Sequence, residues 1–285
     1  MKVVLGFLEL ALGLKFLSTA DLTEHWGILP YELFVGLWAL IFGAMTLYLF
    51  GLIRFPHDNP NATISKKRKG FGTFSAILTL SILSGFMTNP QTQAFKTPFW
   101  LSGLAPSACY SYVKPCYDAS KDSNSTEESG YTYSDHCPPG IKNCFDDYDE
   151  ALRFANEKNM PILVDFTGYG CVNCRKMEEN VWIDQAVNKI LNEEFVLVSL
   201  YVDDRKKLEK VLNTPDGTKI RNVGNKWAQF QKVNFQKSSQ PYYVLISPQE
   251  EVLNQPVGYT PDIKTYTSFL KTGLSIYKGN KRIGK

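Results

Sequence analysis

The chain has 285 residues, six of them cysteine, and a formal net charge of +3. So small an excess of positive charge argues against a protein that binds nucleic acid through its phosphates. Hydrophobic residues make up 44% of the chain, but they are unevenly distributed. An apolar first third is followed by a more polar remainder, which predicts two regions with different surroundings.

Three stretches of the first third are apolar enough to be membrane spans: residues 1–20, 33–53 and 71–88. Each is long enough, or nearly so, to cross a bilayer core of about 30 Å. We therefore predict a membrane domain over residues 1–90. The first stretch could instead be the apolar region of a signal peptide, but Glu9 and Lys15 lie inside it and no small-residue cleavage site is seen. Since a charge within a span usually faces other helices, we expect Glu9 to be packed in a bundle.

The charges of the two short loops predict how these spans are oriented. The first loop contains acidic residues and no Lys or Arg, whereas the second contains Arg54 and the basic run Lys66–Lys69. By the positive-inside rule the second loop is cytoplasmic, so everything after the third span is on the other side. A basic run can also bind nucleic acid or lipid headgroups, but its place between two spans favours the topological interpretation.

A linker over residues 91–136 follows the third span. Its middle, residues 118–134, is rich in Ser, Glu, Asp, Tyr and Gly, so it cannot bury a core and should be irregular. Four cysteines lie in or next to the linker, in two pairs of Cys-x6-Cys spacing: Cys109, Cys116, Cys137 and Cys144. We expect disulfides within each pair, although spacing alone does not determine connectivity. A zinc site that includes His136, or an auxiliary redox couple, are the alternatives.

The region after residue 137 alternates between helical and strand patterns. Residues 146–159 predict a helix and residues 161–166 a buried strand. Further strands are predicted over three β-branched or aromatic runs, residues 195–202, 242–246 and 251–253, the last at an edge. Residues 262–277 predict a closing helix with Pro261 near its first turn. The polar insertion over residues 203–225 is expected to be a solvated surface excursion.

The most informative motif is Cys171-Val-Asn-Cys174, at the step from the first buried strand to a helix. Two intervening residues allow both sulfurs to join in one disulfide. A helix N-terminus lowers the pKa of the first cysteine, and the thiolate is the attacking species in disulfide exchange. A structural disulfide or half of a zinc site has the same spacing. However, no second Cys-x-x-Cys or His-x-His follows to complete a metal site.

Asp165 lies six residues before Cys171, inside the apolar strand. Ionised carboxylates are rarely buried without a reason. Burial would raise the pKa of Asp165, and the carboxylate could then take the proton from Cys174.

These residues carry a resemblance to a known family. Residues 162–177 resemble the active-site strand and helix of the thioredoxin superfamily. Cys-Val-x-Cys followed by Glu178 resembles the C-terminal domain of the DsbD family of membrane thiol:disulfide interchange proteins. The resemblance implies an α/β thioredoxin-like fold over residues 137–285, with a central mixed sheet flanked by helices. It also implies acidic groups at Asp165 and Glu178 beside the dithiol, and a cis-proline at Pro241 opposite it. An ordinary trans proline that begins a strand is the alternative at Pro241.

The first span shares this resemblance, because residues 8–21 are similar to a late helix of the family's membrane domain. That domain has eight helices and a pair of intramembrane cysteines, whereas this chain has three predicted spans without cysteine. We therefore expect either the C-terminal piece of a longer protein or a chain that acts with a CcdA-like partner. By itself it should not relay electrons across a membrane.

The sequence thus predicts a protein-disulfide reductase of the bacterial inner membrane, attached to α-helical spans and with its thioredoxin-like domain in the periplasm. Cys171 would be the nucleophile and Cys174 the resolving cysteine, and exchange between dithiols needs no cofactor or metal. The resemblance implies electrons from cytoplasmic thioredoxin, passed through the membrane domain to periplasmic disulfide proteins, with cytochrome c maturation as one role. A thiol oxidase or isomerase of the same fold, and a non-catalytic assembly module that binds thiol proteins, are the alternatives.

Overall fold

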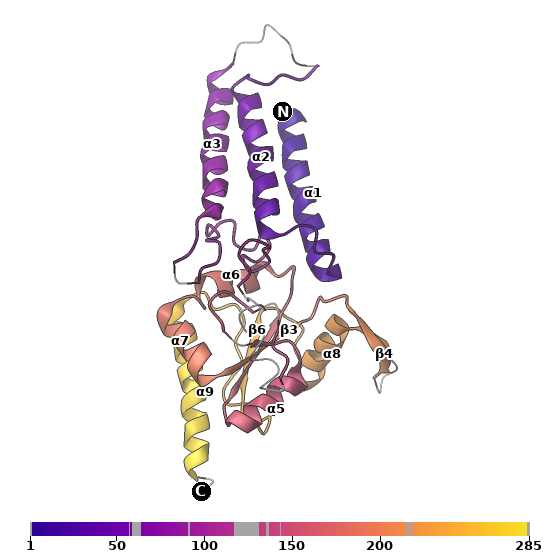
Figure 1. The fold of residues 1–285 in the computed structure, drawn as a ribbon, viewed down its shortest axis with the longest axis vertical. Coiled ribbons are helices and arrows are strands. Elements are labelled where there is room, and N and C mark those ends of the chain that lie inside the picture. The colour runs from indigo at the N-terminus through magenta and orange to yellow at the C-terminus, as the bar shows by residue number, and fades with distance from the viewer. Residues whose placement is uncertain are drawn as a thin grey trace.

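Two structural regions follow one another along the chain in a computed structural model (Figure 1). The structure describes residues 2–56, 58, 64–90, 92–116, 131–134, 137–142, 144–214, 217 and 219–283. Three long helices lie side by side in the first region, and a sheet flanked by helices forms the second. The N-terminus is at the end of the helices that points away from the sheet, and the C-terminus lies at the opposite end of the molecule.

The first region consists of α1 (Lys2–Glu24), α2 (Tyr31–Leu49) and α3 (Lys66–Leu83), followed by the short 3-10 helix η1 (Ser84–Phe86). All three long helices have the length and apolar composition needed to cross a membrane. Aromatic side chains of α2 form the centre of the bundle, where Trp38 donates a 3.1 Å hydrogen bond from Nε1 to the carbonyl oxygen of Ala11.

Two expectations for this region need correction. Glu9 is exposed on the surface of α1 rather than packed in the bundle, because α1 contacts α2 through its other face. The basic run Lys66–Lys69 forms the first turn of α3 instead of a loop, and Ser65 caps that turn by accepting a hydrogen bond from the backbone N–H of Arg68. This basic turn and the second region lie at opposite ends of the bundle (Figure 1).

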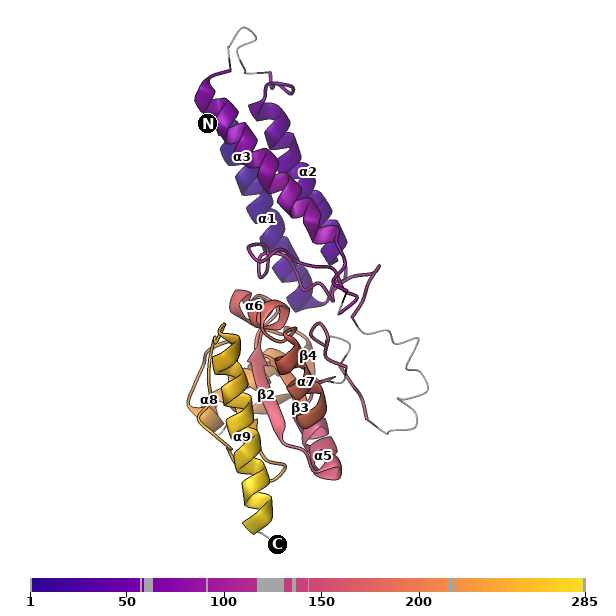
Figure 2. The same ribbon diagram turned by 90° about the vertical axis from the view of Figure 1, so that its left-hand side faces the viewer.

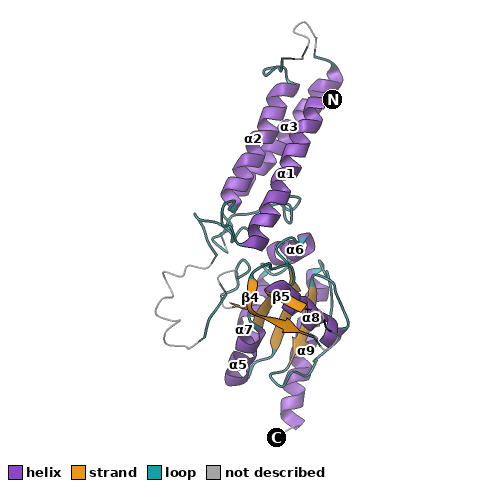
Figure 3. Cartoon of the chain, turned by 90° about the vertical axis from the view of Figure 1, so that its right-hand side faces the viewer, coloured by secondary structure: helices purple, strands orange, loops and turns teal. Residues whose placement is uncertain are grey.

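The second region is built on a four-stranded sheet of β1 (Cys144–Phe145), β2 (Ile162–Thr167), β3 (Val196–Tyr201) and β6 (Tyr242–Ile246) (Figure 3). The strand order is β1-β3-β2-β6. β3 pairs in parallel with β1 and β2, whereas β6 pairs antiparallel with β2. The predicted mixed sheet is therefore present.

Helices cover both faces of this sheet. α5 (Tyr148–Lys158) and α8 (Val223–Phe235) pack on one face. The other face packs against α6 (Val172–Asn180), α7 (Gln185–Glu194) and α9 (Ile263–Ile283). Side chains alternate between the faces along each strand, as the period of two requires. The mixed sheet with helices on both faces is a thioredoxin-like fold.

Several elements differ from the sequence prediction. The insertion after β3 contains a hairpin of β4 (Lys207–Asn213) and β5 (Lys219–Asn222), and α8 begins at its end. The strand expected over residues 251–253 is reduced to a single bridge between Ile246 and Val252. α7 and α8 were not predicted, and α9 is longer than the closing helix expected over residues 262–277.

Between the two regions, residues 87–90 and 92–116 pack against the bundle, where Leu101, Ala105 and Ala108 are buried. Disulfides join Cys109 to Cys116 and Cys137 to Cys144, which confirms the predicted pairing. These bonds leave the four sulfurs no free thiolate for a zinc ion. The expectation of irregular structure in the middle of the linker concerns mainly residues 117–130, which lie outside the described residues, as does His136.

Candidate functional site

The dithiol lies at the first turn of α6, where the chain leaves β2. Cys171 is the N-cap of α6, and its Sγ accepts a 3.1 Å hydrogen bond from the backbone N–H of Cys174. The two cysteines form a disulfide, with Cys171 half-buried and Cys174 buried. A free N–H group and the helix dipole at this position stabilise a thiolate on Cys171. The more accessible sulfur is therefore also the one whose thiolate is favoured.

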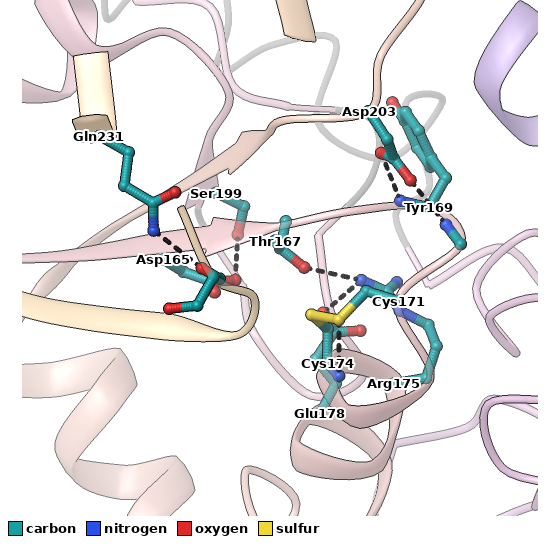
Figure 4. The surroundings of a disulfide bond; sticks show 12 residues. Asp165, Thr167, Tyr169, Cys171, Cys174, Arg175, Glu178, Ser199, Asp203 and Gln231 are labelled. Carbon is teal, nitrogen blue, oxygen red and sulfur yellow. Dashed lines mark hydrogen bonds and ion pairs between the residues drawn. A yellow bond between two sulfur atoms is a disulfide. The ribbon is translucent and has the colours of Figure 1, made fainter. Parts of the chain in front are cut away.

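Asp203 holds the loop that leads to the dithiol. Its two carboxylate oxygens accept hydrogen bonds of 2.8 Å from the backbone N–H groups of Tyr169 and Gly170 (Figure 4). A Cβ at Gly168 would lie 2.3 Å from Oε1 of Gln240 and 2.9 Å from Oδ2 of Asp203, so any larger residue there would displace these two side chains. The loop before Cys171 is thus fixed by a side chain at the end of β3.

Pro241 also lies next to the loop that leads to the dithiol. The Gln240–Pro241 peptide bond is cis, as the resemblance implies. Because Tyr242 pairs with Phe166 at the end of β2, Pro241 comes next to the turn that leads to Cys171. A cavity of about 360 Å³ opens here, lined by Gly170, Cys171, Val172, Asn173, Asp203 and Gln240. Cys171 is therefore part of the wall of this cavity.

Asp165 is buried on the sheet face that α6 covers. It lies opposite Ser199 of β3 and Tyr243 of β6 in register, and its Oδ2 accepts a 3.3 Å hydrogen bond from Ser199 Oγ. Burial raises the pKa of Asp165 to about 7, although the positive charge of Arg175 and the bond from Ser199 oppose the shift. A carboxyl group of this pKa exchanges protons readily near neutral pH.

A buried ion pair lies within α6 itself. Arg175 donates from Nη2 to Oε1 of Glu178 at 2.6 Å and to Oγ1 of Thr167 at 3.2 Å (Figure 4). Burial raises the pKa of Glu178, and the charge of Arg175 counters part of this rise. Asp165 interacts electrostatically with both partners. The buried side chains of two acids, Asp165 and Glu178, and of one guanidinium, Arg175, therefore surround the dithiol helix, and burial also raises the pKa of the neighbouring Glu179.

The structure brings all five predicted site residues to one place: Cys171, Cys174, Asp165, Glu178 and Pro241. Sequence reasoning missed two others. Arg175 could have been found, since a basic residue three positions before Glu178 lies on the same side of a helix. Asp203 gives no local signal, because its hydrogen-bond partners are more than 30 residues away along the chain.

The dithiol end of the domain faces the bundle (Figures 1 and 2). Tyr169 and Tyr201 stack with ring centroids 4.2 Å apart, and Leu22 of α1 packs on them. His25 Nε2 lies 2.8 Å from Oδ1 of Asp204. The end of α1 is therefore in contact with the loop that precedes Cys171.

Several known proteins are similar to part of this chain. The family described as thioredoxin-like matches residues 143–221, and no curated protein matches the chain. Among solved structures, a DsbH oxidoreductase is 20% identical, with a TM-score of 0.35, and the similarity covers 52% of this chain and 96% of that one. A thioredoxin from Thermus thermophilus is 21% identical, with a TM-score of 0.33, and 45% and 84% of the chains are covered.

The C-terminal domain of DsbD from Neisseria meningitidis is 14% identical to this chain, with a TM-score of 0.31. The similarity covers 45% of this chain and 98% of that domain. The strand order and the family match establish the fold. Within the part of the chain that the structure describes, no cluster of His, Cys, Asp and Glu could hold a metal ion. The dithiol, the two buried acids and the fold together support thiol–disulfide exchange as the chemistry of this site.

Proposed function

We propose that the protein is a membrane-anchored thiol–disulfide oxidoreductase that reduces disulfides in other proteins. The observation that carries this proposal is the position of the Cys171–Cys174 pair. The accessible sulfur caps α6, the second sulfur is buried, and Asp165 is buried on the sheet face beneath the same helix. A structural disulfide would need neither this difference in exposure nor an acid that titrates near neutral pH.

The reaction begins from the reduced dithiol. The thiolate of Cys171 attacks one sulfur of a substrate disulfide, so a mixed disulfide forms and one substrate thiolate leaves. Cys174 then loses its proton and attacks the sulfur of Cys171, which releases the second substrate thiolate. Two electrons have moved to the substrate, and the chain holds the Cys171–Cys174 disulfide. The ionised form of Asp165 is the proposed acceptor of the proton from Cys174.

The bundle supports the membrane part of this proposal. Its basic turn is at the end far from the dithiol domain, so the positive-inside rule favours a periplasmic domain in a bacterial inner membrane. The exposed Glu9 on α1 favours further helices around the bundle, because an ionisable side chain is costly in contact with lipid. We propose that the rest of a DsbD-type membrane domain, or a CcdA-like partner, occupies this face and delivers electrons from cytoplasmic thioredoxin.

Reduction of insulin tests whether the site is catalytic. The full chain in detergent, supplied with dithiothreitol, should accelerate the precipitation of insulin chains, and Cys171→Ser should remove that acceleration. Iodoacetamide applied to the reduced protein should inactivate it, whereas the same treatment of the disulfide form should leave activity intact. Equal rates for the wild type and Cys171→Ser would show a binding module rather than an enzyme.

The redox potential of the dithiol tests the direction of exchange. A reductase is expected near the potential of thioredoxin, about −270 mV, whereas a strong oxidant lies near −120 mV. Equilibration of the purified chain with glutathione buffers, followed by alkylation and mass spectrometry of the peptide that contains Cys171, measures this value. A potential near the oxidant end would replace the reductase with the oxidase alternative.

A further inference from the structure

The segment that contains the Cys109–Cys116 disulfide lies directly against the dithiol helix. Nδ2 of Asn180 donates a 3.3 Å hydrogen bond to Oγ of Ser102. A Cβ at Gly103 would lie 2.8 Å from the carbonyl oxygen of Val172, the first residue of α6. The backbones of this segment and of α6 are therefore in direct contact beside Cys171.

The same segment is also held by the bundle. The hydroxyl group of Tyr110 donates a 2.7 Å hydrogen bond to Oδ2 of Asp21, and the carbonyl oxygen of Tyr110 accepts one of 2.7 Å from the backbone N–H of Tyr31. Asp21 belongs to α1, and Tyr31 is the first residue of α2. The Cys109–Cys116 disulfide is thus placed at the boundary between the two regions.

Its two cysteines contact different sides of that boundary. Cys116 packs against the apolar core of the bundle. Cys109 lines a cavity of about 30 Å³, roughly the volume of one water molecule, together with Tyr169 of the dithiol loop and Arg175 of the dithiol helix. Cys109 and two near neighbours of Cys171 in the sequence, Tyr169 and Arg175, therefore line the same cavity.

The other accessory disulfide provides a contrast within the same chain. In both pairs the cysteines are seven positions apart in the sequence, so the two disulfides close loops of equal length. Cys137 and Cys144 are fully buried in the core of the thioredoxin-like domain, whereas Cys109 and Cys116 are half-buried. Accessibility to an attacking thiolate governs which disulfide exchanges, and this criterion selects the Cys109–Cys116 pair.

We propose that Cys109–Cys116 is a second redox couple, which exchanges electrons with Cys171–Cys174 within one chain; this rests on the proposed thiol–disulfide exchange. The thiolate of Cys171 attacks the sulfur of Cys109, so a Cys171–Cys109 disulfide forms and the thiolate of Cys116 leaves. Cys174 loses its proton and attacks the sulfur of Cys171, which releases the thiolate of Cys109. Two electrons pass to the Cys109–Cys116 couple, and the same steps in reverse return them to Cys171–Cys174. An external dithiol supplies the electrons.

Trapping the mixed disulfide tests the contact between the two couples. Cys174→Ser combined with Cys116→Ser leaves Cys171 and Cys109 without their partners, and peptide mass spectrometry of the unreduced full chain in nanodiscs should find the two linked. The matched control combines Cys174→Ser with Cys109→Ser, which leaves the same number of thiols. Its link between Cys171 and Cys116 should be about tenfold less abundant, because only the sulfur of Cys109 is expected to have a high effective concentration near Cys171. Equal yields in the two variants would overturn the proposal.

The rate of reduction tests the exchange itself. With dithiothreitol at about 0.1 mM, the wild-type Cys109–Cys116 bond should be reduced about tenfold faster than in Cys171→Ser, because a tethered thiol has an effective concentration in the millimolar range. Reduction of Cys137–Cys144, read from the same samples, should be equal in both. Equal rates for Cys109–Cys116, with insulin reduction intact in the wild type, would overturn the second couple alone. Loss of wild-type insulin reduction would overturn the proposed function.

Discussion

The helical bundle exposes large apolar side chains, whereas the thioredoxin-like domain buries its apolar side chains and several charged ones. Large apolar side chains are exposed along α1 and α3, among them Leu10, Leu12, Phe16, Phe71, Phe74 and Leu80. The domain buries such side chains in two cores and, near α6, also buries Asp165, Arg175 and Glu178. The outside of the bundle is suited to lipid, whereas the inside of the domain contains the charges that its chemistry uses.

This difference teaches that the two regions depend on different surroundings for stability. In the domain, the apolar core stabilises the fold, and the buried ionisable groups around the dithiol oppose it. In the bundle, the apolar core is built mainly on α2, and most of α1 and α3 remains exposed, which suits these two helices to contact with lipid. Each region should therefore respond to a different perturbation.

Separation of the two regions should have the largest effect. A fragment of residues 131–285 should be soluble and fold cooperatively without detergent, because Tyr131 packs edge-on against Phe154 and belongs to the domain core. A fragment of residues 1–90 should require detergent. Size-exclusion chromatography and thermal unfolding monitored by circular dichroism distinguish these outcomes. Aggregation of the longer fragment in buffer would show that the domain depends on the bundle for its fold.

Arg175→Met should be the most destabilising of the single substitutions considered. It leaves Glu178 buried without its positive partner, and breaking such a pair costs about 3 kcal/mol. The loss should be larger at pH 9 than at pH 6, because Glu178 can be protonated at the lower pH. Urea unfolding of the domain at both values measures it.

The double variant Arg175→Met with Glu178→Gln is the matched control for this loss. It removes both charges, and replacement of a whole buried pair by neutral groups is often close to neutral in stability. Most of the loss should therefore be recovered. A loss that is the same at both pH values and in the double variant would show that packing of Arg175, rather than its charge, stabilises the domain.

Asp165→Asn should stabilise the domain at alkaline pH. An unfolded Asp ionises near pH 4, whereas burial raises the pKa of Asp165 in the folded domain to about 7. Between these values the folded state keeps a proton that the unfolded state has lost, so wild-type stability falls as pH rises through this window. The variant cannot ionise, and its free energy of unfolding should exceed that of the wild type by about 2–4 kcal/mol at pH 8.

The difference should shrink toward pH 4, where both states of the wild type are protonated, and urea unfolding across this range measures it. The same variant should accumulate mixed disulfide with a substrate at pH 7, since Cys174 loses its proposed proton acceptor. A stabilised variant with unchanged product release would show that Asp165 is a buried acid without a part in exchange.

Local patterns in the sequence predicted the centre of the domain well. The sequences of β2 and β6 are apolar and rich in β-branched or aromatic residues, so both strands could be predicted without knowledge of distant residues. The dithiol was recognised by its spacing at the end of the first of these strands. β4 and β5 were missed because most of their side chains are exposed, so no buried face marks them. α8 was missed because it follows this polar hairpin within a stretch interpreted as an excursion.

The missing parts of the site depend on contacts that are distant in sequence. Asp203 follows β3 and contacts the loop that follows the neighbouring strand β2, and His25 contacts Asp204, which lies 179 positions away. The sequence around Asp203 and around His25 contains no pattern that predicts these partners. The contact between the bundle and the dithiol end of the domain could therefore not be predicted from composition or periodicity.

The smallest effect is expected where the two regions meet through exposed charges. Arg205 forms a 2.9 Å ion pair with Glu24 at the end of α1, and its side chain is 63% exposed. Such pairs contribute only about 0.5 kcal/mol, so Arg205→Gln should raise amide hydrogen exchange at Tyr169 and Gly170 about twofold in the full chain in nanodiscs. Lys278→Gln is the matched control, because it removes an equally short exposed pair with Glu194, on α9 and far from the bundle. A rise of tenfold or more for Arg205→Gln alone would show that this ion pair, rather than the packing of Leu22 on Tyr169 and Tyr201, holds the domain against the bundle.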